Sequence, residues 1–96
     1  MKKFDDLVFN PHPAGFGKQA LMFFNNGFGV SVVIHPFSYG GSQGFYELAV
    51  MHGNEDNSSI TYSTPITNDV LGYLSEREVT RVMEKVQKLA PFKKEK

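Results

Sequence analysis

Residues 19–35, QALMFFNNGFGVSVVIH, decide the fold that the sequence predicts. Two apolar runs flank the triplet NNG at positions 25–27, and Asn-Gly is typical of a type I′ turn between antiparallel strands. In the second run an apolar residue occupies every other position from 30 to 34, as in a strand with one buried face. The stretch therefore predicts a β-hairpin with strands over residues 19–24 and 28–35.

Two later segments continue this pattern. Residues 45–52 and 59–63 alternate between apolar and other side chains, so both are predicted to be strands. The expected core pair of the shorter segment is Ile60 and Tyr62. The expected core side of the longer segment consists of Tyr46, Leu48 and Val50.

A glycine-rich segment, SYGGSQG at residues 38–44, separates two of these strands. A phosphate-binding loop normally leads into a helix N-terminus, whose amides and dipole hold the anion. This segment leads into a strand, and no Lys-Ser or Lys-Thr pair follows it. A hairpin connection is therefore predicted, and not a phosphate site.

The C-terminal part predicts one helix. Residues 75–78, SERE, match the capping box, in which a serine hydroxyl and a glutamate three residues later satisfy the first amides of a helix. Residues 69–74, just before it, are expected to form a turn or a short helix, and residues 4–9 a first strand or an edge tether. The helix is expected to run to residue 89 or 90 with one apolar face, formed by Val79, Val82, Met83, Val86 and Leu89.

These elements predict an α+β fold, in which an antiparallel sheet of four to five strands carries one C-terminal amphipathic helix packed on one face. The chain of 96 residues is short enough for a single domain. That domain is assigned to residues 1–90, and residues 91–96, PFKKEK, are expected to be a flexible basic tail. The second sheet face is also partly apolar, so a homodimer through this face or an edge strand is compatible with the sequence. Its apolar residues are Val33, Phe45, Ala49 and Met51.

Composition and motifs argue against an enzyme. The chain has no cysteine, and Gly-x-Ser-x-Gly is absent. His12, His35 and His52 lack metal-ligand spacing, so a metal shared by His35 and His52 is the weakest of the hypotheses. No catalytic residue, cofactor or metal is predicted. No window approaches the length of a membrane span, and a cytoplasmic location without membrane contact is expected.

Aromatic residues in the predicted loops are the main candidates for binding. Three of the four border glycines, and aromatic rings provide contact area to a protein partner at low entropic cost. The alternative is that they fold back over a small core. Acidic loop residues could add contacts that imitate phosphates. The predicted partner-binding residues are Phe16, Phe37, Tyr39, Phe45, Glu47, Glu55 and Asp56.

The charge distribution leaves a second hypothesis open. The net charge is zero, but residues 1–75 contain three lysines against six carboxylates, and residues 76–96 contain seven basic against four acidic residues. A duplex-binding domain usually has a strong overall positive excess, which this chain lacks. A nucleic-acid-associated module would use the basic C-terminal end, with Arg77, Arg81, Lys85, Lys88, Lys93 and Lys94.

Five segments carry a resemblance to a known group. They are KFDDL at residues 3–7, PHP at residues 11–13, NGFGVSVV at residues 26–33, YELAV at residues 46–50 and TPITNDVLGYLSEREV at residues 64–79. With them the chain resembles, over residues 3–89, a group of small uncharacterised proteins encoded by tailed bacteriophages and prophages. The group brings no activity and no catalytic residues. The resemblance implies a bacterial cytoplasm as the setting, and there a small accessory protein that binds a host or phage protein, for example as an inhibitor of a host defence or nuclease system.

Overall fold

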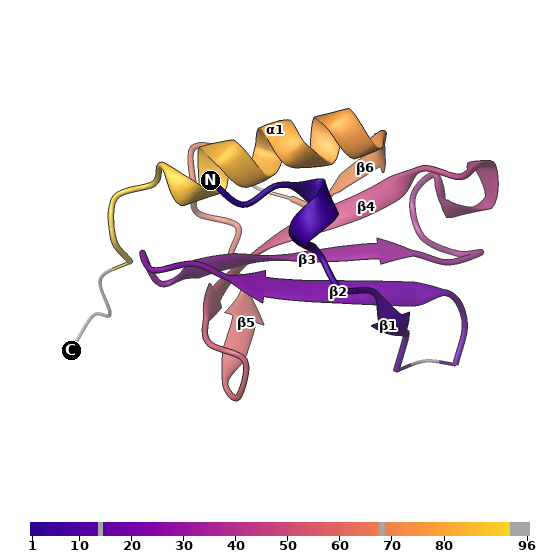
Figure 1. The fold of residues 1–96 in the computed structure, drawn as a ribbon, viewed down its shortest axis with the longest axis horizontal. Coiled ribbons are helices and arrows are strands. Elements are labelled where there is room, and N and C mark those ends of the chain that lie inside the picture. Colours follow the sequence, from indigo (N-terminus) through magenta and orange to yellow (C-terminus); the bar gives the residue numbers. More distant parts are fainter. Residues whose placement is uncertain (14, 68, 93–96) are drawn as a thin grey trace.

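The computed structural model describes residues 1–13, 15–67 and 69–92. It confirms an α+β fold in which one antiparallel sheet carries one helix on one face (Figure 1). The strand order is β1-β2-β3-β4-β5, and β6 pairs with the free part of β4. The elements are η1 (Phe4–Asp6), β1 (Asn10–Pro11), β2 (Lys18–Phe23), β3 (Phe28–Ile34), η2 (Gly41–Gln43), β4 (Tyr46–Gly53), β5 (Ser58–Ile60), β6 (Leu71–Leu74) and α1 (Glu76–Gln87).

The β2–β3 hairpin forms as predicted, but its turn differs from the expected type I′. The amide of Gly27 donates to the carbonyl of Phe24 (3.2 Å), and the amide of Phe24 donates to the carbonyl of Phe28 (2.8 Å). Gly27 has a φ of 83°, whereas Asn26 is not among the residues with positive φ. The loop is therefore a three-residue connection with glycine in the left-handed position. A different turn forms because the Asn26 side chain donates hydrogen bonds to the carbonyls of Val86 and Leu89 at the end of α1.

Strand β4 lies at the centre of the sheet. It pairs with β3 along one side, and on the other side with β5 near Gly53 and with β6 near Tyr46. Residues 71–74 are therefore a strand, and the expected turn or short helix is wrong. They pair because Leu71 and Leu74 both pack on the core beside Tyr46 and Leu48.

The core pair predicted for residues 59–63 is also wrong. Ile60 lies opposite Met51 on the second face and is 43% exposed, and Tyr62 is 50% exposed. Thr61 is buried instead, and its amide donates to the carbonyl of Val50 (2.8 Å). The register with β4 decides this, since a shift of one residue moves every side chain to the other face.

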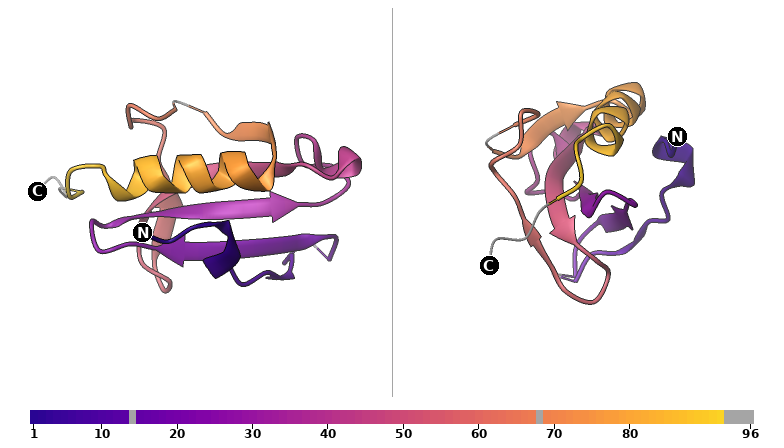
Figure 2. Two further views of the ribbon diagram at one scale, coloured as in Figure 1. Left: turned by 45° about the horizontal axis from the view of Figure 1, so that its top comes forward. Right: turned by 90° about the vertical axis from the view of Figure 1, so that its left-hand side faces the viewer.

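The core lies between the sheet and α1, which runs along one face (Figure 2). The alternation predicted for β3 and β4 is confirmed there. The N-terminal segment joins the same side through η1. A first strand over residues 4–9 is therefore wrong, since residues 4–6 form η1 and the short strand β1 begins only at Asn10. The Phe4 ring packs against those of Phe9 and Tyr46. The fully buried large side chains are Val30, Val32, Leu48, Val50, Val79, Met83 and Val86. None of the described helices is long and apolar enough to cross a bilayer.

The capping box at the start of α1 is confirmed. The Ser75 hydroxyl accepts from the amide of Glu78 (3.2 Å), and the Glu78 carboxylate accepts from the amide of Ser75 (3.0 Å). These bonds satisfy two amides that a helix N-terminus leaves without an intrahelical acceptor. They fix the beginning of α1 directly after β6.

This box predicts an acid dependence of stability. Hydrogen bonds from Ser75, and to a smaller extent the charge of Arg81, hold the pKa of Glu78 below its ordinary value. The folded state then binds fewer protons, so the contribution of Glu78 is present above the unfolded pKa of about 4.3 and is lost as pH falls through the lower folded pKa. Glu78→Gln is expected to make the fall of the thermal midpoint below that pH shallower. Glu84→Gln, on the exposed side of α1, is the control, and equal slopes for both variants would contradict the prediction.

Candidate functional site

The glycine-rich loop between β3 and β4 has a defined compact structure. The Ser38 hydroxyl accepts from the amide of His35 (3.0 Å) and donates to its carbonyl (2.9 Å). A Cβ on Gly41 would collide with this same carbonyl oxygen, so only glycine fits there. The loop then turns through η2 and enters β4, as expected for a hairpin connection.

This loop fixes Tyr39 against β6. The amide of Tyr39 donates to the Glu47 carboxylate (2.9 Å), and the amide of Tyr73 donates to the carbonyl of Tyr39 (3.1 Å). A Cβ on Gly72 would overlap the Cβ of Tyr39, which shows how closely the two segments approach. Tyr39 and Tyr73, 34 positions apart in sequence, are thus held side by side by backbone contacts.

Tyr73 has an unusual backbone conformation. Its φ is 56°, and no other non-glycine residue in the described ranges has a positive φ. It sits in a β-bulge. Leu71 pairs with Leu48 and Leu74 pairs with Tyr46, so two residues of β6 lie opposite the single residue Glu47 of β4. Left-handed backbone costs a residue with a Cβ roughly 1–2 kcal/mol relative to glycine. The Tyr73 residue is 55% exposed, so burial of the ring does not account for tyrosine at this position.

A second group of rings lies on the neighbouring loops. The Phe16 and Phe37 rings pack edge to face with their centroids 6.1 Å apart. The His12 and His35 rings do the same with their centroids 5.0 Å apart. His35 Nδ1 accepts a hydrogen bond from the amide of Phe37 (3.0 Å). This bond sets the tautomer of neutral His35, with its proton on Nε2, and fixes the start of the loop.

Together these loops form one surface, which we call the aromatic end. It lies at the end of the sheet away from the β2–β3 hairpin (Figure 1). The interpretation that these rings fold back over the core is wrong for Phe37 and Tyr39, which are 80% and 60% exposed. Sequence reasoning missed Tyr73, although it borders Gly72 in a predicted turn, because its place beside Tyr39 depends on the pairing of β6. The aromatic end consists of Phe16, Phe37, Tyr39, Phe45 and Tyr73.

The predicted acidic residues do not gather at this surface. Glu47 is half-buried, and its carboxylate accepts the hydrogen bond that positions Tyr39. Glu55 and Asp56 lie in the turn between β4 and β5, at the opposite end of β4. Of the three, the structure brings only Glu47 to the aromatic end, and there it has a positioning role.

The basic candidates lie on the outer side of α1. All four that the structure describes are exposed, but Glu76, Glu78 and Glu84 are exposed on the same helix. Mixed charge of this kind is typical of a solvated helix surface. Lys93 and Lys94 lie outside the described residues. The four described cations are Arg77, Arg81, Lys85 and Lys88.

The hypothesis of a metal shared by His35 and His52 is wrong. His35 follows β3 at the aromatic end, whereas His52 pairs in register with Phe28 at the hairpin end. The His52 ring stacks on Phe92 (4.6 Å), the second residue of the predicted tail. Within residues 1–13, 15–67 and 69–92, no group of three or more His, Cys, Asp or Glu side chains could hold a metal.

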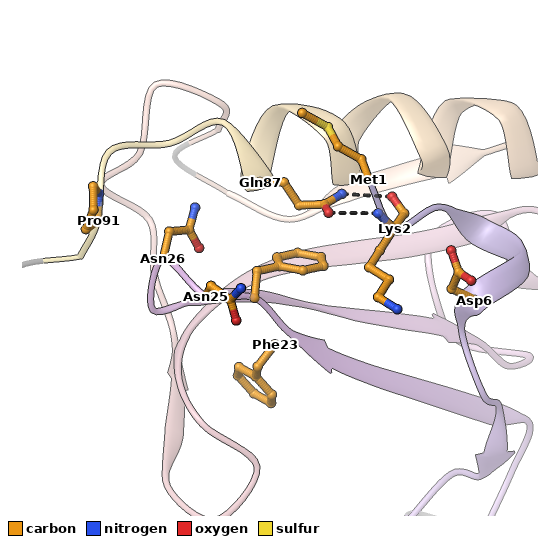
Figure 3. A pocket seen from close by; sticks show the side chains of 9 residues that line it. Met1, Lys2, Asp6, Phe23, Asn25, Asn26, Gln87 and Pro91 are labelled. Atoms are coloured by element: carbon orange, nitrogen blue, oxygen red, sulfur yellow. Dashed lines mark hydrogen bonds between the residues drawn. The ribbon is translucent and has the colours of Figure 1, made fainter.

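A pocket of about 710 Å³ opens at the hairpin end, and no sequence pattern predicted it (Figure 3). It lies between the N-terminal segment and the end of β2. The Gln87 amide group accepts from the Lys2 amide (2.8 Å) and donates to the Lys2 carbonyl (2.8 Å), which fixes one wall. The lining residues are Met1, Lys2, Asp6, Phe23, Phe24, Asn25, Asn26, Gln87 and Pro91.

Comparison with known proteins gives no relative on which to base a function. No protein-family model, curated protein or solved structure matches the chain. The aromatic end and its supporting contacts are therefore the basis of the functional proposal.

Proposed function

We propose that this chain is a small binding protein whose aromatic end docks on a partner protein. The single observation that carries the proposal is Tyr73, whose backbone is strained although its ring is not buried, with the exposed Tyr39 and Phe45 next to it. Strained residues with exposed side chains are typical of functional sites. In the setting that the sequence resemblance implies, the partner is a host or phage protein, and blocking a host defence or nuclease system is the proposed role.

The geometry favours a protein partner over a nucleic acid. Aromatic rings on a fixed backbone lose little conformational entropy on binding and are enriched in interface hot spots. The hydrogen bonds to Glu47 and Tyr73 hold Tyr39 before any partner arrives. Nucleic-acid binding through stacked rings also requires a positive groove. Arg77, Arg81 and Lys85 follow one another along one side of α1 at intervals of four residues, but Glu84 lies beside this row and the chain as a whole has no positive excess.

The proposal is tested by affinity capture of the tagged chain from a bacterial lysate, with nuclease, at low and high salt. One salt-resistant, near-stoichiometric protein partner is expected. The double variant Phe37→Ser/Tyr39→Ser is expected to weaken this partner's affinity by at least about 30-fold, since truncating one hot-spot aromatic typically costs about 2 kcal/mol or more. Tyr62→Ser, at an equally exposed tyrosine away from the aromatic end, is the matched control and should bind normally.

Tyr73→Gly separates function from stability. Removing the strain is expected to raise the free energy of unfolding by about 1 kcal/mol, while partner affinity falls. A variant that is both more stable and still fully able to bind would contradict a role for the Tyr73 ring. Recovery of nucleic acid alone, lost on nuclease treatment, would overturn the proposed function and favour the basic side of α1.

A further inference from the structure

The outer edge of β2 is only partly covered. Strand β1 pairs with Lys18 and Gln19, and no strand of the described chain pairs with β2 beyond Gln19 on that side. At the hairpin end the pocket of Figure 3 separates Phe23 from the N-terminal segment, whose Met1 and Lys2 line its other side. Residues 20–23, ALMF, carry none of the charges, prolines or bulges by which natural proteins usually protect an edge.

The register shows which backbone groups face outward. The amide of Phe24 donates to the carbonyl of Phe28, so these two residues form a hydrogen-bonded pair. The next hydrogen-bonded pair between β2 and β3 is two residues further along, at Met22 and Val30. In an antiparallel ladder such pairs alternate, and residues between them direct their N–H and C=O groups to the other side. Leu21 and Phe23 therefore present two amides and two carbonyls at the open edge. Within the described chain, no hydrogen bond to these four groups is formed.

The open edge matches the same edge of a second copy. In an antiparallel arrangement with a twofold axis at Met22, Leu21 of each copy lies opposite Phe23 of the other, and four backbone hydrogen bonds form. The open stretch is short, because β1 occupies the line of pairing at Gln19 and the hairpin turn begins after Phe24. A longer extended peptide would collide with β1 beside Gln19. The β2 strand of a second copy avoids this collision, because its own hairpin turn begins after Phe24.

Charge also favours a second copy. The edge residues are uncharged, and the net charge of the whole chain is zero, so two copies approach without electrostatic repulsion. Leu21 is 46% exposed and lies on the second face of the sheet, where it would contact Phe23 of the other copy. We propose that this chain forms a symmetric dimer through the outer edges of two β2 strands, which joins two sheets into one.

Sedimentation equilibrium from about 1 µM to 1 mM tests this proposal, since this range covers weak and small interfaces. The mass is expected to rise from 10.8 kDa toward twice that value. Hydrogen exchange should show the amides of Leu21 and Phe23 becoming protected over the same concentrations. A single mass of 10.8 kDa throughout overturns the proposal. A dimer in which these two amides exchange freely also overturns it, because its interface lies elsewhere.

Two variants make the test specific. Leu21→Lys places like charges across the axis and is expected to weaken association by at least tenfold, since like charges on facing strands repel. Ile60→Lys, at a similarly exposed position on β5, is the matched control and should associate as the unmodified chain does. Equal weakening by both variants would show a nonspecific effect of charge and overturn the β2 interface. The test needs no partner protein, so its outcome is independent of the proposed function.

Discussion

Replacing Leu48 by alanine is expected to lower the free energy of unfolding by about 3 kcal/mol, the usual range for a fully buried leucine. Leu48 is 0% exposed, lies in the central strand β4 and packs in the cluster that joins the sheet to α1. Removal of three side-chain carbon atoms leaves a cavity that neighbours on two paired strands and a helix cannot fill. Urea unfolding followed by circular dichroism measures the change.

Leu21→Ala is the matched control for this substitution. It removes the same atoms from β2, which β3 separates from β4, but Leu21 is 46% exposed. Its expected cost is below about 1 kcal/mol, in proportion to the smaller buried area. Similar losses in the two variants would mean that β4 is not the centre of the core.

Replacing Asn26 by alanine is expected to cost about 2–3 kcal/mol, although Asn26 lies in a turn. Its Nδ2 donates to the carbonyls of Val86 (2.8 Å) and Leu89 (3.1 Å), and its Oδ1 accepts from the amide of Phe28 (3.1 Å). A helix end leaves carbonyls without intrahelical donors, and Asn26 supplies donors from the hairpin. The substitution removes three hydrogen bonds and leaves part-buried backbone groups unsatisfied.

The neighbour Asn25 provides the control for Asn26. Asn25 is exposed, so Asn25→Ala is expected to change stability by less than about 0.5 kcal/mol. In the Asn26 variant, hydrogen exchange should accelerate in the last turn of α1 and at Phe92, whose amide donates to the Asn26 carbonyl (2.7 Å). An unchanged last turn would show that the hairpin does not hold the helix end.

Elements encoded by local signals could be predicted from the sequence. The β2–β3 hairpin follows from a turn triplet between apolar runs, and α1 from its capping box and apolar spacing. Strand β4 follows from alternation alone. In each case the residues that determine the element lie within one window of the chain, so no knowledge of distant contacts is needed.

Features that depend on distant pairing could not be predicted. Whether Ile60 or Thr61 faces the core depends on the register with β4, and both choices fit the local sequence. The predicted type I′ turn is wrong because the Asn26 side chain donates a hydrogen bond to a carbonyl near the end of α1, 60 residues away in the sequence. The segment before α1 was expected to be a turn or short helix, yet Leu71 and Leu74 find partners on β4.

Part of the candidate site could likewise be predicted from the sequence, and part could not. Phe16 and Tyr39 could be selected because they border glycines in predicted loops, and Phe37 because it lies in the same predicted loop as Tyr39. The site is completed by Tyr73, which also borders a glycine, Gly72, in a predicted turn, but whose strained place beside Tyr39 arises only when β6 pairs with β4. The Glu47 carboxylate looked like a binding group in the sequence, and its hydrogen bond to Tyr39 gives it a positioning role instead.

The position of α1 has a consequence for biosynthesis. The helix that covers the sheet follows every strand in the chain, and Gln87 binds Lys2 across 85 positions. At the usual 5–20 residues per second, synthesis from Gly53 to Gln87 takes about 2–7 s. During that time the apolar side of β2, β3 and β4 has no covering layer. The nascent chain therefore passes through an interval in which chaperones can bind it and aggregation competes with folding.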